Sequence, residues 1–166
     1  MRLFIAIKPN NALLDALTCA QKKLRAAGVA GNYTKPQNLH ITLAFIGEYP
    51  DRARVLRAMR EVPFAPFDIS LCGTGSFKGV FWAGIKEKGG LASYAERLRG
   101  ALAASGIPFD KKPFSPHITL VREPRGELPP GVLQPAKMLA QRVSLYKSER
   151  GPGGMIYTEL GFTKAE

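Results

Sequence analysis

One tetrapeptide, His-Ile-Thr-Leu, occurs twice in this chain: within Leu-His-Ile-Thr-Leu-Ala-Phe-Ile at residues 39–46 and within His-Ile-Thr-Leu-Val at residues 117–121. Both segments are short, apolar and partly β-branched, which is typical of strands. Side chains two positions apart in a strand point to the same face. We therefore expect His40 and Thr42 to share one face of their strand, and His117 and Thr119 to share the equivalent face of the other.

The segments around the two tetrapeptides also repeat. Each half of the chain has an apolar strand, then a helix that stops near a glycine, then the His-containing strand, then a further strand. Gly28 precedes His40 by 12 residues, and Gly106 precedes His117 by 11. The expected elements are strands at 2–8, 39–46, 67–71, 80–86, 117–121 and 142–146, helices at 11–27, 51–61 and 91–105, and a closing strand at about 155–163.

This repetition predicts an α+β fold with two lobes related by a pseudo-two-fold axis. Each lobe should be an antiparallel sheet with helices outside, and the two His-x-Thr strands should line a central groove. The predicted repeat units are about 2–77 and 79–149, within a single bilobal domain of residues 1–166. The junction near Lys78-Gly79 does not have the composition of a flexible linker, so we expect one cooperative unit.

The charge of the chain favours a polyanionic partner. The 166 residues include 24 Lys and Arg against 13 Asp and Glu, a formal net charge of +11. The excess is +6 in residues 1–83 and +5 in residues 84–166, so no basic tail accounts for it. Nucleic acid and an anionic membrane surface both fit, and a basic surface with no specific partner is the alternative.

The cysteines and the apolar runs point to a cytoplasmic protein. The two cysteines, Cys19 and Cys72, have neither the number for a disulfide framework nor a zinc-binding spacing, and a reducing compartment suits them. The apolar run at residues 3–7 is too short for a signal peptide or a membrane span. We expect cytoplasmic localisation, no membrane association, and a monomer.

Two imidazoles that face each other across a groove suit acid–base catalysis. A neutral imidazole accepts a proton, an imidazolium donates one, and the ordinary pKa of histidine lies near neutral pH. The hydroxyls of Thr42 and Thr119 can donate to anionic oxygens between the rings, so the four side chains describe a site for a tetrahedral anion such as phosphate. A phosphate held on both flanks predicts a ring-nitrogen separation of roughly 6–8 Å.

Arg122 is a candidate fifth member of this site. It lies five residues after His117, on the opposite face of a regular strand, but Glu123-Pro124 should end the strand and let the guanidinium reach the groove rim. A surface arginine is the alternative interpretation. Two imidazoles could also bind a metal ion, although neither motif has a nearby carboxylate, and we expect no metal. No GxSxG turn is present to support a serine hydrolase.

The doubled motif resembles the paired HxTx signatures of the 2H phosphoesterase superfamily, and its surroundings resemble the RNA 2′,3′-cyclic phosphodiesterases of the LigT/ThpR type, formerly called 2′-5′ RNA ligases. The stretches that carry the resemblance are residues 2–7, 38–48, 115–122 and 143–149 and the Gly-Pro-Gly-Gly segment at 151–154 that leads to Tyr157.

This resemblance implies hydrolysis of an RNA-terminal 2′,3′-cyclic phosphate to a 2′-phosphate without a cofactor. It implies that His40 is the proton donor to the departing 3′ oxygen and that His117 is the proton acceptor that activates water. Thr42 and Thr119 would bind the phosphate, assisted by Arg122. The order of the two histidines comes from the resemblance and not from their spacing.

Two other functions remain open at this stage. One is a 2′-5′ RNA ligase that joins a 2′,3′-cyclic phosphate to a 5′-hydroxyl, for example in tRNA halves. The other is a non-catalytic, basic RNA-binding module. Tyr33, Phe45 and Phe114 could stack a terminal base, although core packing suits most of them better.

Overall fold

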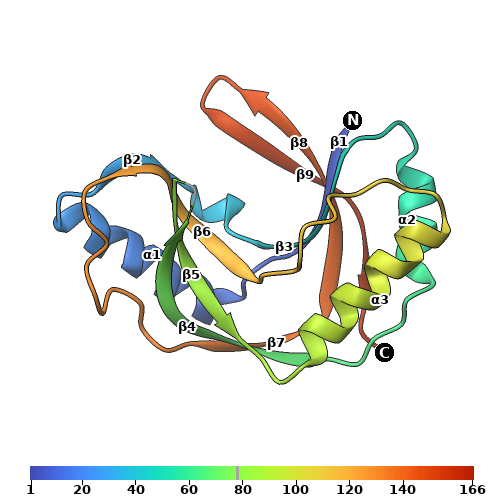
Figure 1. Ribbon diagram of the computed structural model, residues 1–166, viewed down its shortest axis with the longest axis horizontal. Helices are drawn as coiled ribbons and strands as arrows, with labels where there is room; N and C mark the ends of the chain where they lie inside the picture. Colours follow the sequence, from blue (N-terminus) through green and yellow to red (C-terminus); the bar gives the residue numbers. More distant parts are fainter. Residues whose placement is uncertain (78) are drawn as a thin grey trace.

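The computed structural model describes residues 1–77 and 79–166, and their strands form two antiparallel sheets (Figure 1). The first sheet has the order β3-β1-β8-β9, and the second has the order β2-β6-β5-β4-β7. The strands are β1 (Arg2–Ile7), β2 (Ala30–Tyr33), β3 (Ile41–Glu48), β4 (Phe67–Phe77), β5 (Val80–Lys86), β6 (His117–Arg125), β7 (Lys137–Ala140), β8 (Arg142–Gly151) and β9 (Gly154–Lys164). The helices are α1 (Asn11–Ala26), the 3-10 turn η1 (Pro36–Asn38), α2 (Arg52–Arg60) and α3 (Gly90–Ala104).

The α+β prediction with two antiparallel sheets and outer helices is confirmed, and the predicted helix bounds lie within one residue of the structure. Local signals set these ends. The side chain of Asn10 accepts a hydrogen bond from the backbone N–H of Leu13 at 3.0 Å and caps α1. Beyond the C-terminus of α1, Gly28 adopts φ 87°, a conformation that favours glycine.

The two sheets do not correspond to the two halves of the sequence. Strand β4, from the first half, pairs with β5 in the second sheet, and β8, from the second half, pairs with β1 in the first sheet. Only two residues separate β4 from β5, and antiparallel pairing is the natural outcome of so short a connection. The predicted junction at Lys78-Gly79 joins these two strands, and Lys78 itself lies outside the described residues.

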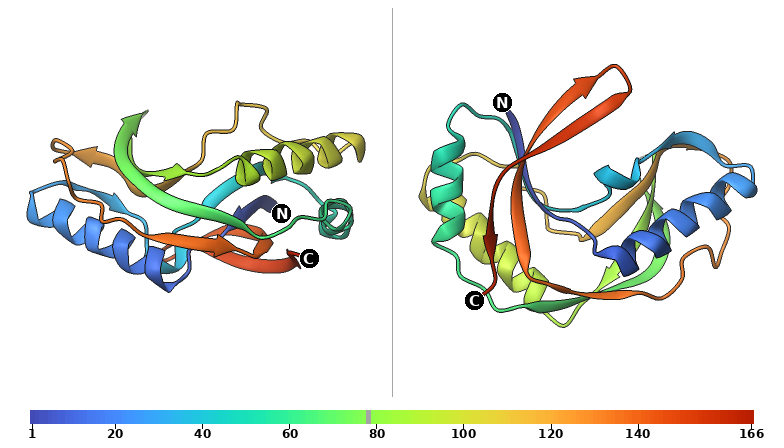
Figure 2. Two further views of the ribbon diagram at one scale, coloured as in Figure 1. Left: turned by 90° about the horizontal axis from the view of Figure 1, so that it is seen from below. Right: turned by 180° about the vertical axis from the view of Figure 1, so that it is seen from behind.

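Helices α1 and α3 also pack against elements from the other half of the chain. Helix α1, from the first half, packs on β6 and β7 of the second sheet, whereas α3, from the second half, packs beside α2 and against β3 of the first sheet and β4 of the second. Figure 2 shows α1 on one side of the molecule and α2 and α3 on the other. The apolar stripes of the helices enter a continuous core that contains residues of both sheets; they include Leu13, Leu17, Leu24, Leu91, Tyr94, Leu98 and Leu102. No helix in the described part of the chain is long and apolar enough to span a bilayer.

Two strands are absent from the sequence-based prediction. Strands β2 and β7 are four residues long and lie at the two edges of the second sheet. The segment Ala30-Gly31-Asn32-Tyr33 has a low propensity for strands, and its pairing with β6 supplies the structure that the local sequence does not. This edge matters because β2 forms one wall of the groove described below.

Candidate active site

The two histidines have matching local environments at the points where β3 and β6 begin. These two strands belong to different sheets and contact each other. The Nδ1 atom of His40 lies 2.7 Å from the carbonyl oxygen of Asn38, and Nδ1 of His117 lies 2.8 Å from the carbonyl oxygen of Ser115. A carbonyl oxygen only accepts, so Nδ1 carries the hydrogen in both rings. In each ring Nε2 is therefore the nitrogen that remains for chemistry.

His40 lies in a desolvated part of the site. Its ring centroid is 5.0 Å from that of Phe4 and 5.4 Å from that of Tyr157. Its pKa is lowered from 6.5 to about 4: burial is the largest cause, the hydrogen bond to Asn38 opposes it, and the positive charges of Lys8 and Arg122 act in the same direction as burial. The free protein therefore holds His40 neutral at pH 7. Its Nε2 atom lies 2.9 Å from Oγ1 of Thr42, which can donate to it.

His117 has an aromatic environment of its own. The ring of Phe77 meets it edge-on at 5.1 Å, and the ring of Trp82 lies 6.4 Å away. Trp82 covers Gly75 so closely that a Cβ atom there would lie 2.2 Å from the indole, so this contact requires glycine. Phe4, Phe77 and Trp82 lie in strands that the sequence predicted or in their extensions, yet nothing local marked them as neighbours of the histidines.

A β-bulge brings Arg122 to the groove. Phe81 pairs with Val121 while the next residue, Trp82, pairs with Thr119, so Leu120 is an extra residue on β6. This insertion reverses the alternation of the strand, and Arg122 lines the same cavity as Thr119 and His40. The expectation that β6 ends at Glu123-Pro124 is wrong, because the strand continues to Arg125. The bulge, and not the end of the strand, brings the side chain of Arg122 to the groove.

Two residues from outside β6 hold this bulge. The buried side chain of Gln21, from α1, donates through Nε2 to the carbonyl oxygens of Leu120 (2.9 Å) and Thr34 (2.8 Å). Gly31, in β2, has φ 149°, and a Cβ atom there would lie 2.8 Å from the side chain of Val121 and 3.0 Å from the carbonyl oxygen of Arg122. Neither residue is recognisable from the sequence, because their roles depend on contacts between α1, β2 and β6.

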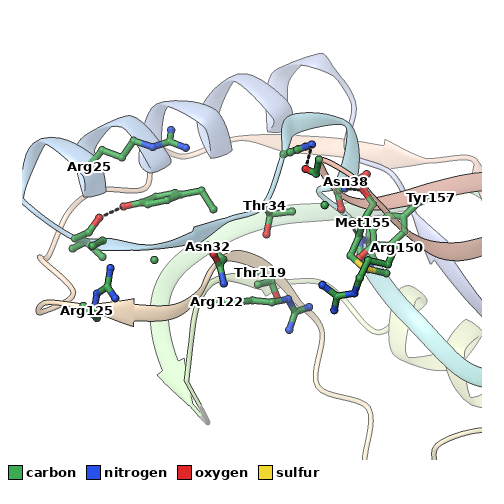
Figure 3. Close-up of a pocket in the computed structure, with 18 of the residues that line it drawn as sticks. Arg25, Asn32, Thr34, Asn38, Thr119, Arg122, Arg125, Arg150, Met155 and Tyr157 are labelled. Atoms are coloured by element: carbon green, nitrogen blue, oxygen red, sulfur yellow. Dashed lines mark hydrogen bonds between the residues drawn. The ribbon is translucent and has the colours of Figure 1, made fainter.

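The groove has a volume of about 1080 Å³ and a strongly basic lining (Figure 3). Of the five predicted site residues, His40, Thr119 and Arg122 line it. Thr42 contacts the ring of His40, and His117 lies two residues before Thr119 on the same strand. Among the described residues, the lining contains no carboxylate, and its cationic side chains are those of Arg25, Lys35, Arg122, Arg125 and Arg150. This composition suits a polyanion.

The three aromatic residues considered for base stacking occupy different places. Tyr33 lines the groove. Phe45 packs beside Phe4 and Tyr146 and has the guanidinium of Arg2 5.0 Å above its ring. Phe114 packs against the main core, with Arg99 5.6 Å from its ring centroid. In the described ranges, 1–77 and 79–166, no group of three or more His, Cys, Asp or Glu side chains could hold a metal ion.

Comparison with known proteins places this site in a family. A family model described as the 2′-5′ RNA ligase superfamily matches residues 15–152. An RNA 2′,3′-cyclic phosphodiesterase of Archaeoglobus fulgidus is 37% identical over 133 residues, 75% of this chain and 74% of that protein. One of Thermus thermophilus is 34% identical over 96% of this chain and 88% of its own length. The crystal structure of Escherichia coli LigT complexed with 3′-AMP superimposes with a TM-score of 0.83 at 27% identity, covering 99% of this chain and 97% of that one. The chain belongs to the 2′-5′ RNA ligase superfamily, whose members share the 2H phosphoesterase fold.

Proposed function

We propose that this protein hydrolyses a 2′,3′-cyclic phosphate at the end of RNA to a 2′-phosphate, using His40 and His117 as acid and base. The observation that carries the proposal is the matched pair of imidazoles, each with Nδ1 bonded to a backbone carbonyl and Nε2 left for proton transfer, that of His40 beside the hydroxyl of Thr42. The names of the relatives agree with this activity. The basic groove supplies the attraction for an RNA end.

In the proposed reaction, Nε2 of His117 takes a proton from water as the water oxygen bonds to phosphorus. The bond between phosphorus and the 3′ oxygen breaks on the opposite side, and the 3′ oxygen takes a proton from Nε2 of His40. The products are a 2′-phosphate and a 3′-hydroxyl. Thr42, Thr119 and Arg122 bind the phosphate oxygens and stabilise the charge that develops on them.

The low pKa of His40 in the free protein is compatible with its role as the acid. A phosphate anion between the rings favours the charged form of the imidazole, so substrate binding raises the pKa of His40 and draws in the proton that the leaving group needs.

The order of the two histidines is testable with a substrate whose 3′ oxygen is replaced by sulfur, because a thiolate departs without an acid. His40→Ala should recover most of its activity on this substrate, and His117→Ala should not.

The activity itself is tested with a nucleoside 2′,3′-cyclic phosphate. We expect His40→Ala and His117→Ala each to lower kcat by about 10²–10⁴-fold, EDTA to leave the wild-type rate unchanged, and phosphorus NMR to identify a 2′-phosphate product. Full activity in both variants would contradict the acid–base mechanism, and loss of activity in EDTA would contradict its metal independence. We do not propose ligation, but an assay with tRNA halves would detect a 2′-5′ linked product.

We also propose that the chain acts as a monomer in the cytoplasm, where its partner is RNA or a cyclic nucleotide. The free cysteines Cys19 and Cys72 support a reducing compartment. Size-exclusion chromatography with light scattering tests the oligomeric state, and a particle of about 18.1 kDa is expected. A stable dimer would contradict this part of the proposal.

A further inference from the structure

The basic groove is longer than a cyclic phosphate requires. Figure 3 shows Arg25 and Arg125 at one end and Arg150 and Tyr157 at the other, with Thr119 and Arg122 between them. Its volume of about 1080 Å³ is at the upper limit of pockets that enclose a whole drug-sized ligand, about 300–1,000 Å³. In the proposed reaction the phosphate binds beside His40 and Arg122, so a second binding region remains on the side of Arg25 and Arg125.

Arg25 is held in place at that end. Its guanidinium lies 4.0 Å from the ring centroid of Tyr33, and the phenol of Tyr33 donates to the carbonyl oxygen of Val29 at 2.6 Å. Stacking occupies one face of the guanidinium and leaves its N–H edge to bind an anion. An exposed arginine that packs in this way loses less conformational entropy on binding a ligand than a free surface side chain would.

Arg125 lies across from this pair at a suitable distance from the catalytic region. Strand β2 pairs with β6 so that Ala30 faces Arg125 and Asn32 faces Arg122. Arg122 and Arg125 are three positions apart on β6 but pair with residues only two apart on β2, and Glu123 between them has φ 49°, so their backbones lie about 7 Å apart, at 3.2–3.4 Å per β2 residue. That separation is comparable to the distance between adjacent phosphates of a nucleic acid strand, so Arg125 suits the phosphate next to the terminal one.

The opposite end of the groove is a weaker candidate. Lys35 donates from Nζ to the carbonyl oxygen of Gly153, so part of its binding capacity is used within the protein. Arg150 then remains as one exposed cation, compared with two at the other end. No carboxylate in the described lining offsets the charges of Arg25 and Arg125, so this end of the groove attracts an anionic ligand.

We infer that Arg25 and Arg125 form a second phosphate subsite, which binds an internucleotide phosphate on the 5′ side of the terminal nucleotide. This inference rests on the proposed function. It means that the enzyme reads the end of an RNA chain, rather than a cyclic mononucleotide, as its preferred substrate class. The subsite adds affinity without base specificity, because it contacts only the backbone.

The test compares a trinucleotide ending in a 2′,3′-cyclic phosphate with the corresponding cyclic mononucleotide. For the wild type we expect kcat/KM to be at least about 10-fold higher on the trinucleotide. Arg25→Gln with Arg125→Gln should remove most of this difference and leave kcat/KM on the mononucleotide within about twofold. The dependence of log KM on log salt for the trinucleotide should become shallower by about 0.7 for each phosphate that the variant no longer binds.

Lys23→Gln is the matched control, because Lys23 lies in the same last turn of α1 and does not line the groove. Arg125→Gln alone is the second variant, since it leaves the contact between Arg25 and Tyr33 intact. Equal rates on the two substrates in the wild type, or equal decreases on both in the variants, would overturn the subsite. If the wild type hydrolyses neither substrate, the proposed function fails, and fluorescence anisotropy with a 3′-phosphorylated trinucleotide still decides whether the arginines bind the chain.

Discussion

His40 connects the chemistry of the site to the stability of the fold. Burial between Phe4 and Tyr157 lowers its pKa to about 4, whereas in the unfolded chain it returns to about 6.5. The unfolded chain therefore takes up this proton near pH 6.5, and the folded protein takes it up only near pH 4. Between these values protonation favours unfolding, so the neutral ring stabilises the fold above pH 6.5 and this contribution disappears by about pH 4.

This difference predicts a pH-dependent loss of stability that belongs to one residue. Between pH 7 and pH 4 the free energy of unfolding of the wild type should fall by roughly 3 kcal/mol because of His40. Urea denaturation at a series of pH values measures it, and His40→Gln, which does not titrate, should lack this component. An equally steep decline in His40→Gln would show that other groups cause it. His117→Gln is the control in the second motif.

At the scale of the element, the bulge in β6 explains why a polar side chain is buried under the sheet. Gln21 provides both hydrogens of its amide to carbonyl oxygens, one of which belongs to the extra residue Leu120. Gln21→Met has a similar shape but no donor, so it should lower the free energy of unfolding by about 1–3 kcal/mol. It should also raise KM for the cyclic phosphate several-fold, because the bulge positions Arg122.

A double-mutant cycle separates this positioning role from simple destabilisation. If Gln21 acts through Arg122, adding Gln21→Met to Arg122→Ala should raise KM no further, even though stability still falls. If Gln21→Met and Arg122→Ala raise KM independently, Gln21 does not act through Arg122. Lys22→Met, an exposed change on the same helix, should leave both KM and stability near wild type.

Elements that carry a strong local pattern could be predicted, and features set by contacts between elements could not. The segment 80–86 was predicted with the bounds of β5, and its apolar composition and flanking residues explain why. The face of Arg122 was predicted for the wrong reason, because one inserted residue reverses every side chain beyond it. The composition of Ala30–Tyr33 resembles a loop, and it becomes a strand only because β6 is available to pair with it.

The site divides in the same way. His40 and His117 are candidates from the sequence because an identical motif recurs at equivalent positions in the repeat, which a structural histidine does not require. Gln21 and Gly31 have no comparable signal: a glutamine in a helix and a glycine after it are ordinary until the packing of α1 and β2 on β6 is known. Gln21 and Gly31 position the backbone of β6, and this role is visible only in the structure.

For the whole molecule, the exchange of strands between halves has a consequence for folding. Each sheet needs strands from both halves, and one core cluster includes Leu145 of the first sheet and Ile118 of the second. Neither lobe can bury its apolar face using its own half of the sequence. We therefore propose that residues 1–166 form one domain that unfolds in a single cooperative step.

Leu145→Ala, a change in the first sheet, tests this cooperativity through its effect on the second sheet. Leu145 is fully buried in β8 and pairs with Ile5, so its truncation should lower the free energy of unfolding by about 2–5 kcal/mol. Trp82, the single tryptophan of the chain, lies in β5 of the other sheet. Its fluorescence should report the same shifted urea midpoint as circular dichroism, because loss of the first sheet removes the partners of the second.

Leu139→Ala, at a site 49% exposed, should change the stability by less than about 0.5 kcal/mol. A fluorescence midpoint that stays at its wild-type value while circular dichroism shifts would mean that the lobes unfold separately, as two domains.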